Sequence, residues 1–370
     1  MNPENRQRLR TPQGTEGFFL EEAYRHRQLL RLTESHFESW GYLPVLTPVF
    51  DYFETYRPLL SHAQEERSYR FPDRKGELLM LRSDITLFLA KQMGLSLKNA
   101  PLPRRVYYAD SIIRHQEDED ISSDEFFQSG AELIGLKGMD GDLEVLMLLQ
   151  DLLSAMKLPE WRMHIGSRAL LDAVLEGKAD SVEAGNLLEI RDEDGMCRFF
   201  EKSGLSAVKE RTNLLLFLGT PEEFAADSPA LVKAIPSDSG SGSGIGKAVE
   251  KLKTLAFTLS ETASLENIRI DLSEHGGMPY YTGFTVKAYV EGANSAVASG
   301  GRYDSLLGSF GSSAPAAGFS LMMRKIEPLS TYAADAAEKA PISLAEGLDF
   351  SSRYKDAGEK RKKGGRVAIS

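Results

Sequence analysis

The segments RRVYYADSIIRHQ (104–116) and FFQSGAELIGL (126–136) decide the fold. Both are runs of strand length dominated by β-branched, aromatic and other apolar residues, so each predicts a β-strand. A very acidic stretch at residues 117–120 lies between them, which predicts a hairpin with a mobile connecting loop. The remaining predicted elements group around this hairpin.

On its N-terminal side, residues 20–40 form a helical pattern with apolar residues at mixed three- and four-residue spacing, and Gly41 is placed to end it. Residues 42–56 (YLPVLTPVFDYFETY) are rich in strand formers but include Pro44 and Pro48. Because proline cannot donate to a central ladder, we expect an edge or interface strand here.

The other elements follow from the same criteria. Strands are predicted on either side of a turn at 72–76, and at 161–166, 268–272, 280–290 and 295–301. Helices are predicted after 81–86, at 140–158 with a cap near residues 140–142, and from about Ala316 to 326.

The pattern changes between about 167 and 264 to short helices with glycine, serine and aspartate breaks, and SDSGSGSGIG (237–246) precedes the last of them. We interpret this region as an inserted helical subdomain with a flexible connector. The predicted core is therefore split into 1–166 and 265–330 around the insertion at 167–264, and a tail or βα fragment follows at 331–370. This order predicts an α+β fold with a mostly antiparallel sheet flanked by helices.

Composition narrows the classes of function. The 370 residues include 44 Lys and Arg against 54 Asp and Glu, a formal net charge of −10. An acidic chain repels polyanions, which argues against extended nucleic-acid binding unless a basic face is segregated. The single cysteine, Cys197, excludes an internal disulfide and a cysteine-based zinc site and fits a reducing cytosol, so we expect a cytoplasmic protein. We also expect no metal and no cofactor. No apolar run reaches membrane-spanning length, so no membrane partner is expected.

Several segments carry side chains suited to a small polar ligand. Acceptors and hydroxyls come from Asp84, Thr86, Gln128, Glu132, Tyr280 and Tyr281. Histidine needs an anionic partner for its ammonium group, an acceptor for its ring N–H and an aromatic wall, and two carboxylates with two tyrosines on a sheet would supply these. The alternative is that Asp84 caps the helix that follows it and that the tyrosines pack in the core.

Four segments together resemble, in this order, the catalytic domain of histidyl-tRNA synthetases, which are class II aminoacyl-tRNA synthetases: LRSDIT (81–86), IIRHQ with FFQSGAELIG (112–135), YYTGFT (280–285) and SGGRYDSLLGSFGSSAPAAGFS (299–320). The strand around Pro48 matches the first class II motif, the dimer strand. The resemblance covers about residues 10–330 and implies a class II synthetase-like sheet.

The same resemblance implies a histidine pocket. It places Asp84 and Thr86 with Gln128 at the amino group, and Glu132 with Tyr281 at the imidazole. Arg114 and Tyr280 complete the implied site.

The chain departs from the synthetases where ATP is used. The synthetases have Val-Arg-Gly-Leu-Asp-Tyr-Tyr where residues 275–281 read HGGMPYY, so Gly276 replaces the arginine that would hold the α-phosphate and the substrate carboxylate. Adenylate formation develops charge on phosphoryl oxygens, which a positioned cation stabilises. Glycine supplies none, and we interpret the neighbouring His275 as a loop histidine.

The second and third class II motifs depart as well. Arg114 is kept, but Gln116 replaces a glutamate and the acidic loop at 117–120 would repel ATP. Residues 322–325 (MMRK) replace Gly-Leu-Glu-Arg, so Arg324 is shifted by one residue, which on a helix turns it by about 100°. The sequence thus predicts a histidine binder that no longer activates histidine.

This profile resembles the synthetase-like regulatory subunits of ATP phosphoribosyltransferase. Well under half of an anticodon-binding domain follows Lys325, so we expect no tRNA partner. The resemblance implies a subunit without catalytic activity of its own that activates the short catalytic ATP phosphoribosyltransferase in the first step of histidine biosynthesis, and that takes part in feedback inhibition by histidine. It also implies a hetero-octamer and a homodimer through the strand from Leu43 to Tyr52. The alternatives are a catalytic fragment of a histidyl-tRNA synthetase and a stand-alone histidine sensor.

Overall fold

The computed structural model describes residues 12, 14–15, 17–97, 101–115, 124–236, 242–262, 265–338, 343–347 and 349–369. Three features of the sequence therefore lie outside the described residues: Gln116, the acidic stretch at 117–120, and the first half of the glycine-serine connector at 237–241.

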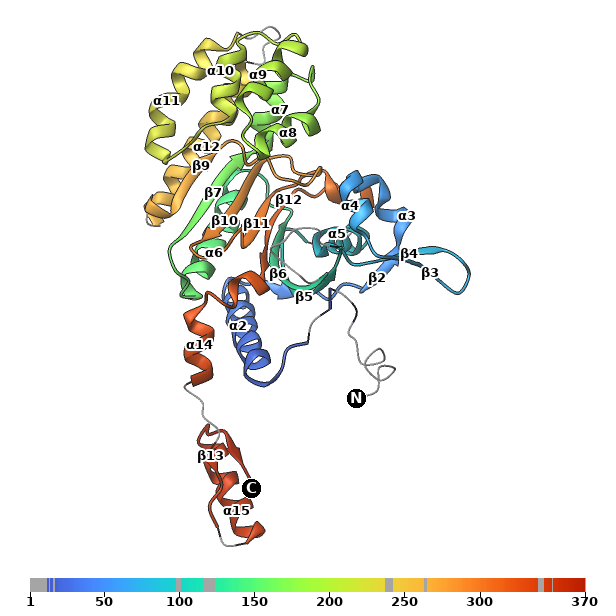
Figure 1. Ribbon diagram of the computed structural model, residues 1–370, viewed down its shortest axis with the longest axis vertical. Coiled ribbons are helices and arrows are strands. Elements are labelled where there is room, and N and C mark those ends of the chain that lie inside the picture. Colours follow the sequence, from blue (N-terminus) through green and yellow to red (C-terminus); the bar gives the residue numbers. More distant parts are fainter. Residues whose placement is uncertain are drawn as a thin grey trace, which may run out of the picture.

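A large sheet forms the middle of the molecule (Figure 1). In the described part of the chain it has nine strands, in the spatial order β1 (Leu43–Pro44), β5 (Arg104–Ile113), β6 (Glu125–Ile134), β12 (Ala316–Met322), β11 (Ala298–Arg302), β10 (Phe284–Val290), β7 (Trp161–Ser167), β9 (Ile268–Asp271) and β8 (Leu218–Gly219).

The sheet is mostly antiparallel, as the sequence predicted. Its longest pairing joins β5 to β6 over ten residues each, which confirms the predicted central hairpin. Parallel pairing is restricted to β1 with β5 and β7 with β9. The fold class, a class II synthetase-like antiparallel sheet flanked by helices, is the one that the sequence predicted.

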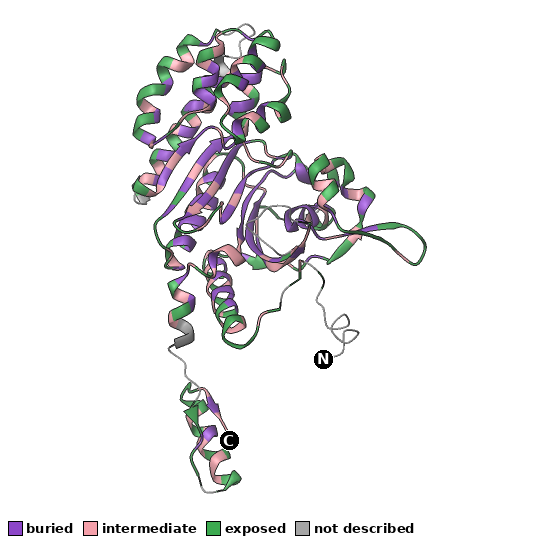
Figure 2. Cartoon of the chain, viewed as in Figure 1, coloured by how far each residue is buried: buried purple, intermediate pink, exposed green. Residues whose placement is uncertain are grey.

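Three long helices cover one face of the sheet and enclose the main hydrophobic core: α2 (Leu20–Ser39), α6 (Met139–Ala155) and α12 (Gly242–Thr262). Amphipathic packing explains α2, because Leu29, Leu30 and Phe37 point into the core while the rest of its surface is largely exposed. Gly41 adopts a φ of +79° just after α2, which confirms its predicted role in ending the helix. In Figure 2 the strands of the main sheet are largely buried, whereas the outer faces of the surrounding helices are exposed.

Helices fill the chain between β7 and β9 and form the part of the molecule at the top of Figure 1. Besides α12 they are α7 (Arg168–Leu175), α8 (Ser181–Glu189), α9 (Glu193–Lys202), α10 (Val208–Leu215) and α11 (Pro221–Ala234). The short strand β8 lies within this region and pairs with β9, so the insertion also supplies the last strand of the main sheet.

A smaller lobe packs on the other side of the β5–β6 hairpin. It consists of a three-stranded sheet with the order β2 (Phe50–Tyr52), β4 (Leu78–Leu81), β3 (Arg70–Pro72), together with α3 (Phe53–Tyr56), α4 (His62–Arg67), α5 (Ile85–Ser96) and the 3₁₀ turns at Arg57–Leu59 and Leu306–Phe310. A second hydrophobic cluster, which includes Phe53, Tyr56, Phe88 and Tyr303, holds this lobe together.

Residues 343–347 and 349–369 at the C-terminus form a small unit of their own (Figure 1), whereas the helix before them, α14 (Thr331–Glu338), packs against α2. A further 3₁₀ turn, at Leu265–Asn267, precedes β9. After β12 the chain continues as α13 (Met323–Ile326), α14 (Thr331–Glu338), β13 (Ser343–Leu344), α15 (Phe350–Lys362) and β14 (Val367–Ala368). Strands β13 and β14 pair in parallel, so this unit is a small βαβ fragment.

Five local predictions were wrong. The single strand expected over 42–56 is instead two short strands in different sheets, β1 and β2, followed by the helix α3. The expected helix from Ala316 is the strand β12, inserted between β11 and β6, because an apolar run such as AAGFSLM does not distinguish a buried strand from a helix. The residue that caps α6 is Gly138 rather than an aspartate. Helix α12 starts at Gly242, within the expected connector. The tyrosine pair precedes β10 instead of lying in it.

Candidate ligand-binding site

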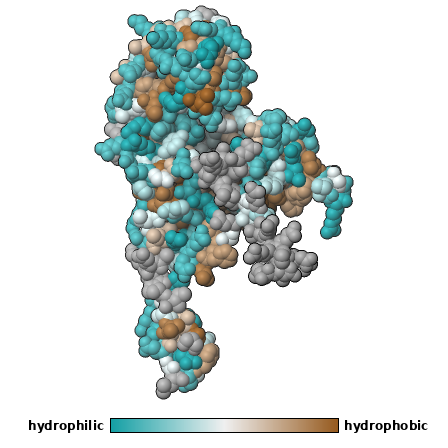
Figure 3. Space-filling view, viewed as in Figure 1, coloured by the Kyte–Doolittle hydropathy of each residue, from teal (hydrophilic) through white to brown (hydrophobic). Residues whose placement is uncertain are grey.

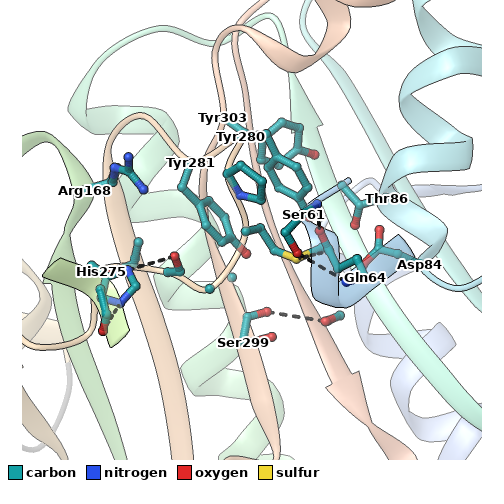
Figure 4. A pocket seen from close by; sticks show the side chains of 18 of the residues that line it. Ser61, Gln64, Asp84, Thr86, Arg168, His275, Tyr280, Tyr281, Ser299 and Tyr303 are labelled. Carbon is teal, nitrogen blue, oxygen red and sulfur yellow. Dashed lines mark hydrogen bonds between the residues drawn. The ribbon is translucent and has the colours of Figure 1, made fainter. Parts of the chain in front are cut away.

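A cavity of about 870 Å³ opens between the main sheet, the small lobe and the insertion. All of the residues that the sequence assigned to the site line it: Asp84, Thr86, Arg114, Gln128, Glu132, Tyr280 and Tyr281. These residues lie up to about two hundred positions apart in the chain, and the fold brings them to one place. Figure 4 shows Asp84 and Thr86 on one side of the tyrosine pair and Arg168 with His275 on the other.

Glu132 forms the floor of the cavity from β6. It is 1% exposed and accepts hydrogen bonds from the Thr86 hydroxyl (2.8 Å) and from the Tyr303 hydroxyl. Burial, together with the nearby charge of Asp84, raises the pKa of Glu132 to about 8. The carboxylate fits there because Gly318 faces it across the β6–β12 ladder, where a Cβ would overlap its oxygen.

Asp84 and Thr86 enter the cavity from the start of α5. Asp84 caps this helix, since its Oδ1 accepts from the Leu87 N–H at 3.0 Å. It also lines the cavity, so the capping role and the binding role predicted from the sequence are compatible rather than exclusive. Burial raises the pKa of Asp84, and the positive charge of Arg114 opposes that rise.

Gln128 offers a hydrogen-bond acceptor that no described residue uses. Its side chain lines the cavity and the residue is 2% exposed, yet its Oε1 has no hydrogen-bond partner among the described residues. A buried amide oxygen without a partner is costly, so this atom is suited to accept from a ligand.

Aromatic rings form one wall. The rings of Tyr280 and Tyr281 lie 5.2 Å apart, and Tyr280 meets Tyr303 edge to face at 5.7 Å. Burial raises the pKa of all three phenols, so they remain neutral donors. Sequence reasoning placed Tyr281 beside Glu132 but missed Tyr303, although the RYD segment that carries it had been singled out.

Gly276 lies behind the tyrosine wall with a φ of +77°. A Cβ at this position would overlap the ring of Tyr281 and approach the methyl group of Thr285. The backbone and the Tyr281 ring therefore disfavour any side chain at the position where the synthetases carry arginine. His275 contacts two backbone carbonyls, of Gly185 in α8 and of Gly276, each at 3.1 Å, and burial lowers its pKa.

The insertion supplies the far wall through α7 and α8. Arg168 lies at the mouth of the cavity, where its Nε is 2.8 Å from Asp172 and its Nη2 donates to Ser181 at 3.0 Å. On the small lobe, Gln64 of α4 reaches across to Met278 at 2.8 Å. Sequence reasoning identified none of these wall residues, because contacts between the insertion, α4 and the 273–281 loop arise only in the folded chain.

A second cavity of about 800 Å³ adjoins the first. Its basic lining residues are Arg67, Arg114, Lys287 and Lys325. Lys287 pairs with Glu274 at 2.6 Å, and Lys325 donates to the Ser295 hydroxyl. Arg324 does not line either cavity in the described part of the chain and instead stacks over Phe18 at 4.3 Å, consistent with the predicted rotation away from that face.

Among the described residues, no three His, Cys, Asp or Glu side chains gather as metal ligands would. The described helices also include none that combines the length and apolar character needed to cross a membrane.

The fold and the cavity define a class II aminoacyl-tRNA-synthetase-like domain. Comparisons with known proteins show to which family of such domains the chain belongs. A family model described as histidyl-tRNA synthetase matches residues 14–326. An ATP phosphoribosyltransferase regulatory subunit from Moorella thermoacetica is 31% identical over 98% of this chain and 92% of its own length. One from Ruminiclostridium cellulolyticum is 27% identical over 87% of this chain and 76% of its own length.

Solved structures agree on the fold. A protein from Bacillus halodurans, described as an ATP phosphoribosyltransferase regulatory subunit/histidyl-tRNA synthetase, superposes with a TM-score of 0.81 at 24% identity, covering 98% of this chain and 92% of that one. A histidyl-tRNA synthetase from Nostoc superposes with a TM-score of 0.76 at 18% identity, covering 98% and 85%. The chain belongs to the family of histidyl-tRNA-synthetase-like regulatory subunits of ATP phosphoribosyltransferase.

Proposed function

We propose that this chain is a regulatory subunit without catalytic activity of its own, which activates a short catalytic ATP phosphoribosyltransferase in the first step of histidine biosynthesis and mediates part of its inhibition by histidine. Membership of the regulatory-subunit family supports the role in the pathway. The observation that carries histidine binding is the convergence of all seven predicted residues on one cavity.

The chemistry of the cavity matches histidine in three places. Asp84 supplies an anionic partner for the ammonium group, with the Gln128 Oε1 as a second acceptor. Glu132 lies deeper and offers a carboxyl group to the ring nitrogens. The Tyr280–Tyr281 pair supplies an aromatic wall against which an imidazole ring can pack.

The same site lacks a feature needed to activate histidine. A cation at position 276 would stabilise the charge that develops on the α-phosphate, but glycine supplies none, and the positive φ and the Tyr281 ring disfavour a side chain there. This supports ligand binding without adenylate formation.

We propose further that the chain forms a homodimer through the segment from Leu43 to Tyr52, within a hetero-octamer with the catalytic subunit. Leu43 is 66% exposed, Leu46 79% and Phe50 53%, so this segment presents a continuous apolar stripe. Figure 3 shows apolar surface on the lobe that carries α3 and β2. A second copy of the chain is the proposed occupant, because the matching segment is the isologous dimer strand of class II synthetases.

A reconstituted assay tests the proposed function. The short catalytic subunit is measured for phosphoribosyl transfer alone, with this chain, and with this chain plus increasing histidine. We expect this chain to raise the activity and histidine to lower it. Gln128→Leu, which removes the open acceptor without adding charge, should retain activation and weaken inhibition. Activity that is unchanged by this chain would reject the regulatory role, and histidine binding without activation would favour a stand-alone sensor.

A further inference from the structure

Arg82 joins the predicted dimer strand to the ligand cavity. It is 1% exposed, and its Nη1 donates to both the carbonyl and the hydroxyl oxygen of Thr47, each at 2.9 Å. On its other side Nε and Nη2 donate to the Ser111 carbonyl at 3.0 and 2.6 Å, and Nη2 lies 2.8 Å from Asp110. Thr47 lies within the Leu43–Tyr52 segment that presents the apolar stripe, with its own side chain buried, and Asp84 follows Arg82 by two residues.

Lys91, in α5, makes a second connection between the stripe and the segment that begins at Arg82. Its Nζ lies 2.6 Å from the Asp51 Oδ2, which also accepts from the Tyr56 hydroxyl at 2.8 Å. Asp51 is in β2, at the end of the stripe, and Lys91 is in α5. The ring of Tyr56 stacks on Phe88 of α5 with centroids 4.6 Å apart, so the contact is packed as well as ionic.

The segment between Arg82 and Lys91 carries Asp84 and Thr86, which line the cavity. It is therefore tied to the stripe at both ends, while Ser83, Asp84 and Thr86 face the cavity and the apolar residues of the segment pack in the cluster behind it. The same hydrophobic cluster contains Phe53 and Tyr56 behind the stripe and Tyr280 and Tyr303 at the cavity. A packed cluster of this kind transmits small displacements because it cannot deform continuously.

We propose that Arg82 and Lys91 are positioning residues that couple the stripe to the cavity, so that ligand binding at Asp84 and Thr86 and self-association through the stripe change one another's affinity. This inference rests on the proposed function, since it takes histidine as the ligand and a second copy as the partner. Linkage is reciprocal: the factor by which saturating histidine strengthens dimerisation equals the product of the factors by which dimerisation strengthens histidine binding at the two sites of the dimer.

The test measures that factor in the full-length chain. The dimer dissociation constant is determined by analytical ultracentrifugation with and without saturating histidine, for wild type, Thr47→Val, Lys91→Met and Arg82→Gln. Thr47→Val removes one acceptor of Arg82 without changing side-chain volume much, and Lys91→Met keeps the aliphatic stem while leaving Asp51 its bond from Tyr56. Lys178→Met is the control, since Lys178 pairs at 2.9 Å with Glu176, which likewise keeps a second partner, Arg211.

We expect a coupling factor of about fivefold or more for wild type and Lys178→Met. The coupling factor should fall in Thr47→Val and approach one in Lys91→Met and Arg82→Gln. If Arg82→Gln does not fold, Thr47→Val and Lys91→Met test the inference. A loss of stability alone would leave the factor unchanged, so an undiminished factor in Thr47→Val and Lys91→Met would overturn the inference while histidine binding and dimerisation stand. A wild-type chain that binds no histidine or stays monomeric would instead overturn the proposed function, and the inference with it.

Discussion

Tyr303 donates a hydrogen bond to Glu132, and Thr86 donates to the other oxygen of the same carboxylate. The group proposed to contact the histidine ring thus already connects β6, the turn after β11 and the start of α5. A ring N–H of histidine therefore has to share a Glu132 oxygen that already accepts a hydrogen bond. Substitutions at Glu132 will therefore change the stability of the fold as well as the affinity for histidine, and the two effects need separate measurement.

Glu132→Ala should destabilise the protein and weaken histidine binding. It leaves the Tyr303 and Thr86 hydroxyls without their acceptor in a buried site, at a cost of about 1–3 kcal/mol in the free energy of unfolding. Glu132→Gln should cost less, because the amide oxygen still accepts. Tyr303→Phe is the matched variant: it removes one donor and should lower stability while leaving an oxygen of Glu132 available to histidine. Urea unfolding and calorimetric titration separate these effects, and a Glu132→Ala protein of wild-type affinity would exclude the ring contact.

The pH dependence of stability should carry the signature of Glu132. Its pKa is raised from 4.5 to about 8 in the folded chain. Below pH 4.5 the carboxyl is protonated in both states. As pH rises from 4.5 to 8, the unfolded chain releases the proton while the folded chain retains it, so the free energy of unfolding falls across this window. Gln cannot ionise, so the difference in stability between wild type and Glu132→Gln should be larger at pH 5 than at pH 8. An equal difference in stability at pH 5 and pH 8 would contradict a raised pKa for Glu132.

Asp84 combines two roles that substitution can separate. Asp84→Asn keeps an oxygen for the Leu87 N–H, so the helix cap and the stability should be nearly unchanged, while the loss of charge weakens histidine binding by about 1.5–3 kcal/mol. Asp84→Ala should lose the cap too, at about 1 kcal/mol of stability. Affinities are read by titration and stabilities by thermal unfolding. If Asp84→Asn bound histidine like the wild type, Asp84 would be a helix cap alone.

The residues that the sequence assigned to the site line one cavity, whereas the walls around them were not predicted. Asp84, Gln128 and Glu132 belong to motifs that occur in the same order in the synthetases, and the strand β6 that carries Gln128 and Glu132 has a strong β pattern, so the resemblance implied that the three would lie together. Arg168 and Gln64 belong to elements whose mutual position depends on tertiary packing, and no local pattern marks them.

The errors in the secondary structure predicted from the sequence also arise from tertiary packing. The segment 316–322 is buried on both faces between β11 and β6, which removes the polar alternation that distinguishes a strand from a helix. Arg82 illustrates a further limit: an arginine next to a cavity motif is expected to face the ligand, but its guanidinium is satisfied by Thr47, Ser111 and Asp110 behind the site.

The glycine at position 276 should prevent histidine activation in a way that arginine cannot repair. We expect no histidine-dependent ATP–pyrophosphate exchange from the wild-type chain, because no side chain at this position can hold the α-phosphate. Gly276→Arg should remain inactive and lose stability, since its φ of +77° alone costs a non-glycine residue about 1–2 kcal/mol and its Cβ would overlap Tyr281. Gly277→Arg, one residue along where a Cβ meets nothing within 4 Å, is the control for added charge and should fold normally. Exchange above background in the wild type would refute the loss of activation, and exchange restored in Gly276→Arg would show that this loop rearranges to admit the side chain.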